Sequence, residues 1–237
     1  MASSEVSDES SFRYERKFLV TGPATNLVDS ILNRHPSFFR EIFQKRQVSN
    51  IYLDSPTLKS MRDNIDGNKN RTKTRIRWYG PIDAQTNKVA LELKIKRGLV
   101  GKKVSFALAP MASREGCSTQ VTDRLFAASQ LPDNLRLHLS LLRPTLLNSY
   151  TRRYYLSADG HFRITVDREL RYYPATPSGL SLPSQDRETV VVELKFDVEH
   201  SEESDHIASA FPFRLSRSSK YVTGMQMVHG IQLSGLA

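Results

Sequence analysis

Cysteine is nearly absent from this chain of 237 residues, and Cys117 is the single thiol. One cysteine excludes an internal disulfide and fits a reducing compartment. Long apolar runs are also missing, so no transmembrane helix is expected. The first eleven residues, MASSEVSDESS, have neither a basic start nor an apolar segment, which argues against a signal peptide. A cytoplasmic protein without a membrane segment is therefore expected.

The sequence also lacks histidine motifs for metal binding or catalysis and has few acidic residues relative to basic ones. The six histidines show no spacing typical of a metal site, and no sequence signal pairs a histidine with Cys117. Acidic residues are too few to balance the basic ones: 25 Asp and Glu oppose 34 Lys and Arg, which gives a formal charge of +9. This excess favours an anionic partner such as nucleic acid, a phosphate compound or a membrane surface, without choosing among them.

The pattern of apolar residues and turn signals predicts a β-rich chain with a few helices. Residues 1–11 are rich in Ser and acids and are expected to be disordered, and no linker divides residues 12–237 into two domains. Eight strands are predicted at about 12–20, 45–53, 72–79, 88–97, 102–109, 150–156, 161–173 and 189–198. Helices are predicted at about 24–34, 55–64, 120–130, 133–142, 202–210 and 217–228. The segment 174–187 is predicted to be a mobile loop.

The stretch TKTRIRWYG, residues 72–80, places an unusual charge pattern on one predicted strand. Because side chains alternate between the two faces of a strand, Lys73, Arg75 and Arg77 share a face. Trp78 lies on the opposite face and is expected to pack under a helix. Three cations on one face repel each other, so this face requires something that compensates their charge.

The same division into one apolar and one charged face recurs on other predicted strands. The charged faces mix both signs, and the spacing Glu-x-Lys occurs three times. The charged sets on the further strands are Arg13, Glu15 and Lys17; Glu92, Lys94 and Lys96; Lys103 and Ser105; Tyr150, Arg152 and Tyr154; Arg163, Thr165, Asp167 and Glu169; and Glu193, Lys195 and Asp197.

Two architectures can hold this pattern. An antiparallel sheet can turn its charged face to water, and in that case Arg75 and Arg77 are plain exposed cations. Alternatively, eight strands can close into a barrel whose charged faces point inward. Burying such charges is costly unless a ligand neutralises them. A polyphosphate chain would do so, with a divalent metal between phosphates and glutamates, since Arg and Lys bind phosphate oxygens and carboxylate oxygens suit Mg²⁺ or Mn²⁺.

Six pieces of the sequence, in this order, carry a resemblance to a known family: YERKFLV, TRIRWYG, ALELKIKRG, SYTRRYYL, VVVELKF and SRSSKYVTGM. From about residue 12 to 228 the chain resembles the VTC domain, the polyphosphate polymerase domain of vacuolar transporter chaperone complexes, within the triphosphate tunnel metalloenzymes. The resemblance implies an α+β fold: a closed eight-stranded antiparallel β-barrel flanked by helices. It also implies a tunnel that transfers the terminal phosphoryl group of ATP to a polyphosphate chain.

The resemblance assigns roles to particular residues. It implies a divalent metal, Mn²⁺ or Mg²⁺, on Glu193, and ATP with polyphosphate or tripolyphosphate as ligands. The residues implied for catalysis are Lys17, Arg75, Arg77, Lys94 and Arg152, and those implied for further phosphate contacts are Arg62, Lys102, Lys103, Tyr150, Ser219 and Lys220. We expect Lys17, Arg75, Arg77, Lys94, Arg152 and Glu193 to point into one lumen. Crowding of like charges there is expected to lower the pKa of Lys17 and Lys94.

Two other functions stay open. Related hydrolases begin with Glu-x-Glu-x-Lys, and a triphosphate or nucleoside triphosphate hydrolase is possible on the same fold. This chain has Arg13 in place of the first glutamate, followed by Glu15 and Lys17, which favours the polymerase. A nucleic-acid-binding β protein would also be basic, but the glutamates on the charged faces would repel a nucleic acid backbone, so no nucleic acid partner is expected.

Overall fold

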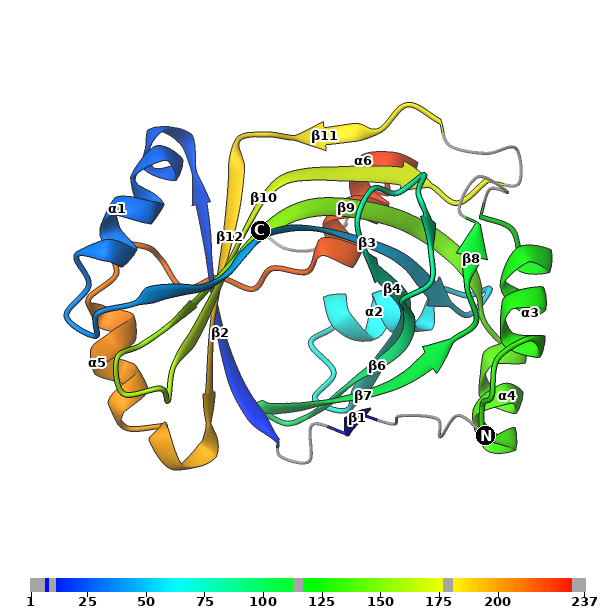
Figure 1. The fold of residues 1–237 in the computed structure, drawn as a ribbon, viewed down its shortest axis with the longest axis horizontal. Helices are drawn as coiled ribbons and strands as arrows, with labels where there is room; N and C mark the ends of the chain where they lie inside the picture. Colours follow the sequence, from blue (N-terminus) through cyan, green and yellow to red (C-terminus); the bar gives the residue numbers. More distant parts are fainter. Residues whose placement is uncertain (1–6, 9–11, 113–116, 177–180, 232–237) are drawn as a thin grey trace.

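Eight antiparallel strands form a closed ring in the computed structural model, which describes residues 7–8, 12–112, 117–176 and 181–231 (Figure 1). The order around the ring is β7, β2, β12, β10, β9, β3, β4 and β6, and β6 pairs again with β7. The bounds are β2 Arg13–Thr21, β3 Arg40–Asp54, β4 Arg71–Tyr79, β6 Val89–Arg97, β7 Val100–Leu108, β9 Arg143–Leu156, β10 Arg163–Pro174 and β12 Thr189–Asp197. The closed eight-stranded antiparallel architecture expected from the sequence is confirmed.

All eight predicted strands exist, and two are longer than predicted. The strands β3 and β9 begin at Arg40 and Arg143, several residues earlier than their alternation suggested, and they pair with each other as far as Asp54. The predicted mobile loop at 174–187 was wrong in part, because β11 (Ser184–Asp186) pairs with β10. Residues 177–180 of that segment lie outside the described residues. A separate small pair joins β5 (Gln85–Thr86) to β8 (Met111–Ala112).

The seam between β2 and β7 is the least paired part of the ring. One residue pair, Arg13 with Gly101, joins the two strands. The short strand β1 (Ser7–Asp8) pairs with β7 at Ser105 and Val104. These two residues belong to the predicted disordered tail, and its other members, 1–6 and 9–11, lie outside the described residues.

Apolar faces of the strands point outward and are covered by helices at both ends of the view in Figure 1. The helices α3 (Thr119–Ala127) and α4 (Asp133–Ser140) cover one apolar cluster, which includes Ile76, Leu91 and the buried Trp78. On the opposite side, α1 (Val28–Asn33) and α5 (Glu203–Ser209) cover a second cluster built around Phe18 and Ile164. Two short 3₁₀ turns, Gly22–Leu27 and Val198–His200, precede these two helices. The outward apolar faces therefore account for two of the three apolar clusters, as the alternation predicted.

The helix α6 (Lys220–His229) packs on the inner face of the ring rather than on the outer one. Its Tyr221 and Met225 join a third apolar cluster with Tyr52 and Tyr150, which lie on the face of their strands that also carries the charges. The helix begins at Ser219, whose hydroxyl caps it by accepting a hydrogen bond from the Val222 backbone amide at 3.4 Å. The charged interior is thus closed on one side by an apolar helix.

The shorter helix α2 (Lys59–Ile65) is tied to α6 by a buried carboxylate. Asp54, at the end of β3, accepts hydrogen bonds from the backbone amides of Ser60 and Met61 at 2.9 and 3.0 Å. It also accepts one from the Tyr221 hydroxyl at 2.8 Å. One side chain therefore fixes the start of α2 and the position of α6. In the residues that the structure describes, no helix is long and apolar enough to cross a membrane.

A bulge on β10 changes which of its residues face the interior. Between Arg168 and Arg171 the strand carries one residue more than its partner β9, and Glu169 there adopts a positive φ of 55°. Because one extra residue reverses the alternation, Asp167 before the bulge and Tyr172 after it both face inward, although their numbers differ in parity.

We predict that Gly224→Ala destabilises the fold, although alanine is the better helix former. An added Cβ would lie 2.5 Å from Leu146 Cδ2 and 2.5 Å from Tyr172 Cδ1, and both side chains are fully buried. Such overpacking costs about 1–3 kcal/mol, which exceeds the gain of about 1 kcal/mol in helix propensity. Thermal unfolding measures the difference. Gly101→Ala is the matched control, because its Cβ would meet Ile95 O at an ordinary 3.6 Å. Equal melting temperatures for Gly224→Ala and the parent would show that α6 does not sit this tightly against β9 and β10.

Candidate functional site

Three carboxylate centres organise the cations on the inner face of the ring. The first is Glu92 on β6, which is paired in register with Arg75 on β4. Arg75 donates two hydrogen bonds to Glu92 Oε2, at 2.8 Å from Nε and 2.6 Å from Nη2. Arg77 lies 3.4 Å and Lys103 3.6 Å from the same carboxylate. Although burial raises the pKa of Glu92, these three cations hold it well below its ordinary value.

The second centre joins Glu193 on β12 with Glu15 on β2. Lys17 lies 3.2 Å from Glu193, and Lys195 lies 3.7 Å from Glu193 and 4.0 Å from Glu15. Lys94 reaches Glu15 at 2.6 Å from β6, which is separated from β2 by β7. Burial raises the pKa of Glu15, but Lys17 and Lys94 outweigh it and lower this pKa to about 2.

The third centre is Asp167 on β10, a fully buried carboxylate. Arg152 binds it with both arms of its guanidinium, at 2.5 and 2.7 Å, and Lys220 at the start of α6 lies 2.6 Å away. Arg152 and Lys220 also approach Glu193, at 3.8 and 3.9 Å, which connects the second and third centres. The network therefore runs across strands that are not neighbours in the ring.

Tyr150 lies between these centres and contacts their cations. Its hydroxyl accepts a hydrogen bond from Arg77 Nη2 at 3.0 Å. The Lys220 ammonium and the Arg152 guanidinium lie 4.9 and 5.2 Å from the centroid of its ring. Burial raises the pKa of Tyr150, yet Arg152 and Arg77 outweigh it, so the net direction is downward. Arg77 also donates a second hydrogen bond, from Nε to Asn50 Oδ1 at 2.8 Å.

Two lysines, Lys73 and Lys17, donate hydrogen bonds to residues just before α6. Lys73 Nζ donates to the Ser219 hydroxyl at 2.8 Å, and Lys17 Nζ donates to the Ser218 carbonyl at 3.2 Å. Burial, followed by the charges of Lys17 and Lys94, holds the pKa of Lys73 well below its ordinary value. A negative group near Lys73 would favour its protonated form and raise this pKa.

The expectation of lowered lysine pKa values was right for Lys94 and wrong for Lys17. Burial and the charge of Lys17 lower the pKa of Lys94 to about 8, although Glu15 opposes the shift. Burial also acts to lower the pKa of Lys17, but Glu15 and Glu193 flank this residue and raise it above its ordinary value. Pairing with carboxylates therefore outweighs crowding at Lys17.

The structure brings together most residues that the sequence proposed. Those on the inner face and within the network are Lys17, Arg75, Arg77, Lys94, Lys103, Tyr150, Arg152, Glu193, Ser219 and Lys220. Two others are elsewhere. Arg62 is exposed on α2, and Lys102 is opposite Ile95 on the other face of its strand from Lys103. The functional roles of the gathered residues stay predictions.

Besides Glu15, sequence reasoning gave no role to four network residues that the structure places beside the predicted ones: Lys73, Glu92, Asp167 and Lys195. All four had the parity of a charged face, which was the available signal. Parity could not reveal which residues these side chains contact. Asp167 pairs with Lys220 on α6, and Lys73 donates to Ser219 at the start of the same helix. Such partners depend on how the ring closes over α6.

The residues present fit a divalent metal that also binds phosphate oxygens. Glu193 and Glu15 are joined through Lys17 and Lys195, and Glu15 Oε1 is buried without a hydrogen-bond partner among the described residues. A carboxylate oxygen left open in this way is a suitable hard ligand for Mg²⁺ or Mn²⁺. The described residues contain no group of three or more His, Cys, Asp or Glu that could hold a metal ion. Phosphate oxygens would therefore have to complete the coordination.

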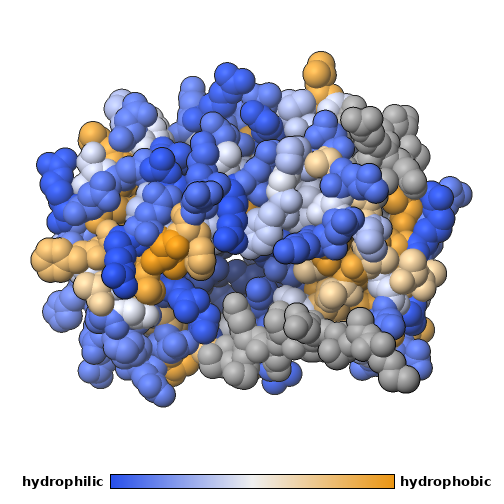
Figure 2. All heavy atoms as spheres, in the orientation of Figure 1, coloured by the Kyte–Doolittle hydropathy of each residue, from blue (hydrophilic) through white to orange (hydrophobic). Residues whose placement is uncertain are grey.

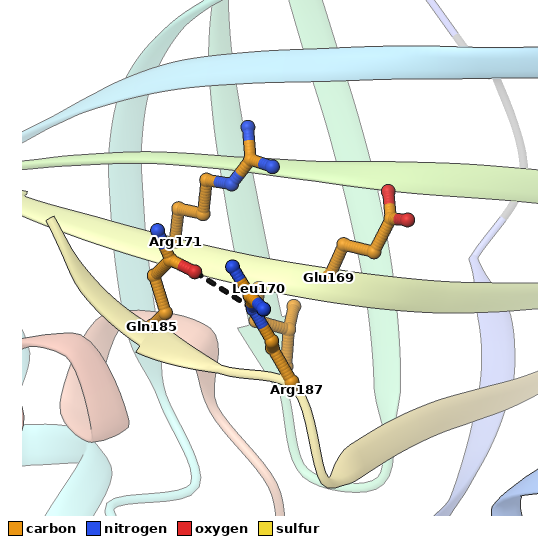
Figure 3. A pocket seen from close by; sticks show the side chains of 5 residues that line it. All are labelled: Glu169, Leu170, Arg171, Gln185 and Arg187. Atoms are coloured by element: carbon orange, nitrogen blue, oxygen red, sulfur yellow. Dashed lines mark hydrogen bonds between the residues drawn. The ribbon is translucent and has the colours of Figure 1, made fainter.

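A pocket on the molecule lies away from this network, on the outside of the ring. It is lined by Glu169, Leu170, Arg171, Gln185 and Arg187, from β10 and from β11 with the residue that follows it (Figure 3). Arg187 Nε donates to Gln185 Oε1 at 2.9 Å. Arg171 is in register with Gln185, on the face opposite the inward Tyr172. The network, rather than this pocket, is the candidate site.

Figure 2 shows a mainly hydrophilic face that is hollowed near its middle, with hydrophilic residues visible at depth.

The sequence matches the family model of the VTC domain over residues 12–229. The chain belongs to the VTC domain family. This confirms the resemblance read from the sequence. The comparison with curated proteins gave no match.

Solved structures with the same fold are only distantly similar in sequence. HpAC1 from Hippeastrum, a candidate adenylyl cyclase described as having a dominant triphosphatase activity, has a TM-score of 0.52 at 15% identity, covering 94% of this chain and 98% of that one. A candidate adenylate cyclase from Vibrio parahaemolyticus has a TM-score of 0.51 at 12% identity, covering 91% and 99%. Another from Bacillus halodurans has 0.51 at 15%, covering 88% and 94%. At this identity the likeness shows the fold.

We predict that the binding of tripolyphosphate weakens as pH rises through about 8. In the free protein Lys94, with its pKa near 8, loses its proton above that pH and no longer attracts the anion. Binding should therefore take up a proton between pH 8 and 9, which calorimetry in buffers of different ionisation enthalpy measures. Lys94→Arg is the control, because arginine stays charged throughout this range. The same proton uptake in Lys94→Arg as in the parent would assign the titration to another group or to the ligand.

Proposed function

We propose that this protein is an ATP-polyphosphate phosphotransferase, that is, a polyphosphate polymerase that works inside the ring. The observation that carries this proposal is the imbalance of charge on the inner face. Nine cations of the network, namely Lys17, Lys73, Arg75, Arg77, Lys94, Lys103, Arg152, Lys195 and Lys220, oppose the four carboxylates Glu15, Glu92, Asp167 and Glu193. A chain of phosphates is the kind of ligand that neutralises such an excess along an enclosed path. Membership of the VTC domain family supports it.

The inner cations divide into groups that suit different parts of the substrate. Arg75 and Arg77 offer two guanidinium groups side by side on β4, which suits planar recognition of phosphate oxygens. Lys94 lies on the neighbouring strand β6, and Lys17 lies on β2, beyond β6 and β7 in the ring. Lys220, the first residue of α6, adds an ammonium at the positive end of the helix dipole. In this arrangement the triphosphate of ATP is held along its length and cannot rotate.

Transfer in such a site depends on position and on charge rather than on a protein nucleophile. A terminal oxygen of the polyphosphate chain attacks the γ-phosphorus, a new P–O bond forms, and the bond to ADP breaks. The arginines hold the transferring group in line and stabilise its negative oxygens, an effect that amounts to several kcal/mol in comparable sites. A divalent metal on Glu193, beside Glu15, would supply Lewis acid stabilisation of the phosphates when bound.

A triphosphate hydrolase on the same fold is the second candidate. It is supported by the triphosphatase activity described for HpAC1, whose structure is similar. Against it stands Arg13, which occupies the position of the first glutamate of the hydrolase pattern and pairs with Asp197 at 2.9 Å instead of offering a carboxylate. A nucleic acid partner is less favoured, because an eight-stranded ring has room for side chains or one small ligand but not for a duplex.

The decisive test identifies the product made from ATP by the purified protein with Mg²⁺ or Mn²⁺. We expect ADP together with long-chain polyphosphate, detected by gel electrophoresis and ³¹P NMR. Orthophosphate without polyphosphate would establish a hydrolase, and cyclic AMP with pyrophosphate would establish a cyclase. Either result would overturn the polymerase proposal and leave the tunnel intact.

Two variants separate phosphate binding from metal chemistry. Arg75→Ala should weaken tripolyphosphate binding by about 1.5–3 kcal/mol, because it removes a charge-assisted contact. Glu193→Gln should abolish metal-dependent turnover while metal-free binding of tripolyphosphate persists or tightens, since Lys17 and Lys195 lose a competing carboxylate. Calorimetry and the product assay measure the two effects. Full metal-dependent activity in Glu193→Gln would show that the metal is held elsewhere, and unchanged binding in Arg75→Ala would move the phosphate site away from β4.

A further inference from the structure

Three aromatic rings surround the guanidinium of Arg46, in a part of the inner face away from the carboxylates of the network. The guanidinium of Arg46 lies 4.9 Å from the ring centroid of Phe43, 5.3 Å from that of Tyr79 and 5.7 Å from that of Tyr154. Phe43 and Tyr154 meet edge to face, with centroids 5.7 Å apart. We call these four residues the aromatic cluster.

The aromatic cluster continues the inner face that carries the phosphate-binding candidates. Arg46 is in register with Arg152, and Phe43 is in register with Tyr154. Tyr79 follows Arg77 by two residues on the same face of β4, which places it roughly 7 Å further along the strand. The Arg152 guanidinium also stacks on Tyr154, at 5.9 Å, as well as on Tyr150. A continuous strip of rings and guanidiniums therefore leads from the network to the aromatic cluster.

The aromatic cluster is open to solvent and lacks a carboxylate. The side chains of Phe43 and Tyr79 are each 49% exposed, although they are large and aromatic. Arg46 forms no ion pair with any residue that the structure describes. Arg153 shows the contrast: on the other face of β9 it lies 3.5 Å from Asp29 and 3.8 Å from Glu41. Exposed rings around an uncompensated cation suit a ligand that is flat, aromatic and attached to negative charge.

We propose that the aromatic cluster is the subsite for the base of a nucleoside triphosphate, whose phosphates extend inward to Arg152 and Arg77. The inference rests on the proposed function, because it assumes that the phosphates bind in the ring. The base stacks on Phe43 and Tyr79, and the Arg46 guanidinium packs over its face. Stacking uses the π-face that every base has, so the subsite favours nucleotides over inorganic tripolyphosphate without selecting adenine over guanine.

The test compares two ligands that differ in the base. Calorimetry with chelator present measures the affinity of a nonhydrolysable ATP analogue and of tripolyphosphate, so that no turnover occurs. Phe43→Ala should weaken binding of the ATP analogue about tenfold, as expected for the loss of one stacking contact, and leave tripolyphosphate within about twofold. Phe43→Tyr keeps a ring and should retain the affinity of the parent. A GTP analogue should respond to Phe43→Ala as the ATP analogue does.

A matched control is Phe38→Ala, since Phe38 is also an exposed aromatic residue, 73% accessible, but precedes β3 and takes no part in the aromatic cluster. It should change neither affinity. If Phe43→Ala leaves the ATP analogue unaffected, or weakens both ligands equally, the base subsite is refuted while the phosphate tunnel stands. If the parent protein binds the ATP analogue but not tripolyphosphate, the proposed function and this inference both fail.

Discussion

Mutual repulsion among cations that face one another inside a closed ring is the constraint on which this structure depends. The free protein compensates it in part with Glu15, Glu92, Asp167 and Glu193, each of which contacts at least two cations. Removing buried charges from water is costly, and each pair repays this cost only through close contact and further hydrogen bonds. Four carboxylates offset part of this repulsion and leave an excess of positive charge, which favours an anionic ligand.

The apolar part of the structure has the complementary role. Helices α1, α3, α4 and α5 cover the outer faces of the strands and form the core, which allows the inner faces to remain polar. The exception is α6, which is apolar toward β9 and β10 and presents Lys220 and the Ser219 hydroxyl to the charges. The close approach of its backbone at Gly224 makes this placement specific, because no larger residue fits between Leu146 and Tyr172.

Carboxylates compensate the charge of the inner lysines unevenly. Lys17 lies between two carboxylates and stays firmly protonated, whereas Lys94 and Lys73 lie where burial and other lysines disfavour their charge. A negative charge placed near the second kind of residue would favour their protonated forms. Cations in one enclosed space therefore differ in how far neighbouring carboxylates compensate their charge.

Alternation of side chains made the architecture predictable from the sequence. A period of two is a local property, so the charged parity of Arg75, Glu92 or Glu193 could be read from a few neighbours. Its recurrence on many strands was compatible with an open sheet or a closed ring, and the resemblance to the VTC domain implied the closed ring. Contacts between distant elements could not be read in this way. The pairing of Lys94 with Glu15 across β7, the bulge that turns both Asp167 and Tyr172 inward, and the entry of α6 into the ring depend on register and closure. Within each regular stretch of strand, the sequence by itself determined which residues share a face. Only the tertiary structure decided which charges meet, because distances across a ring depend on the register of all its strands together.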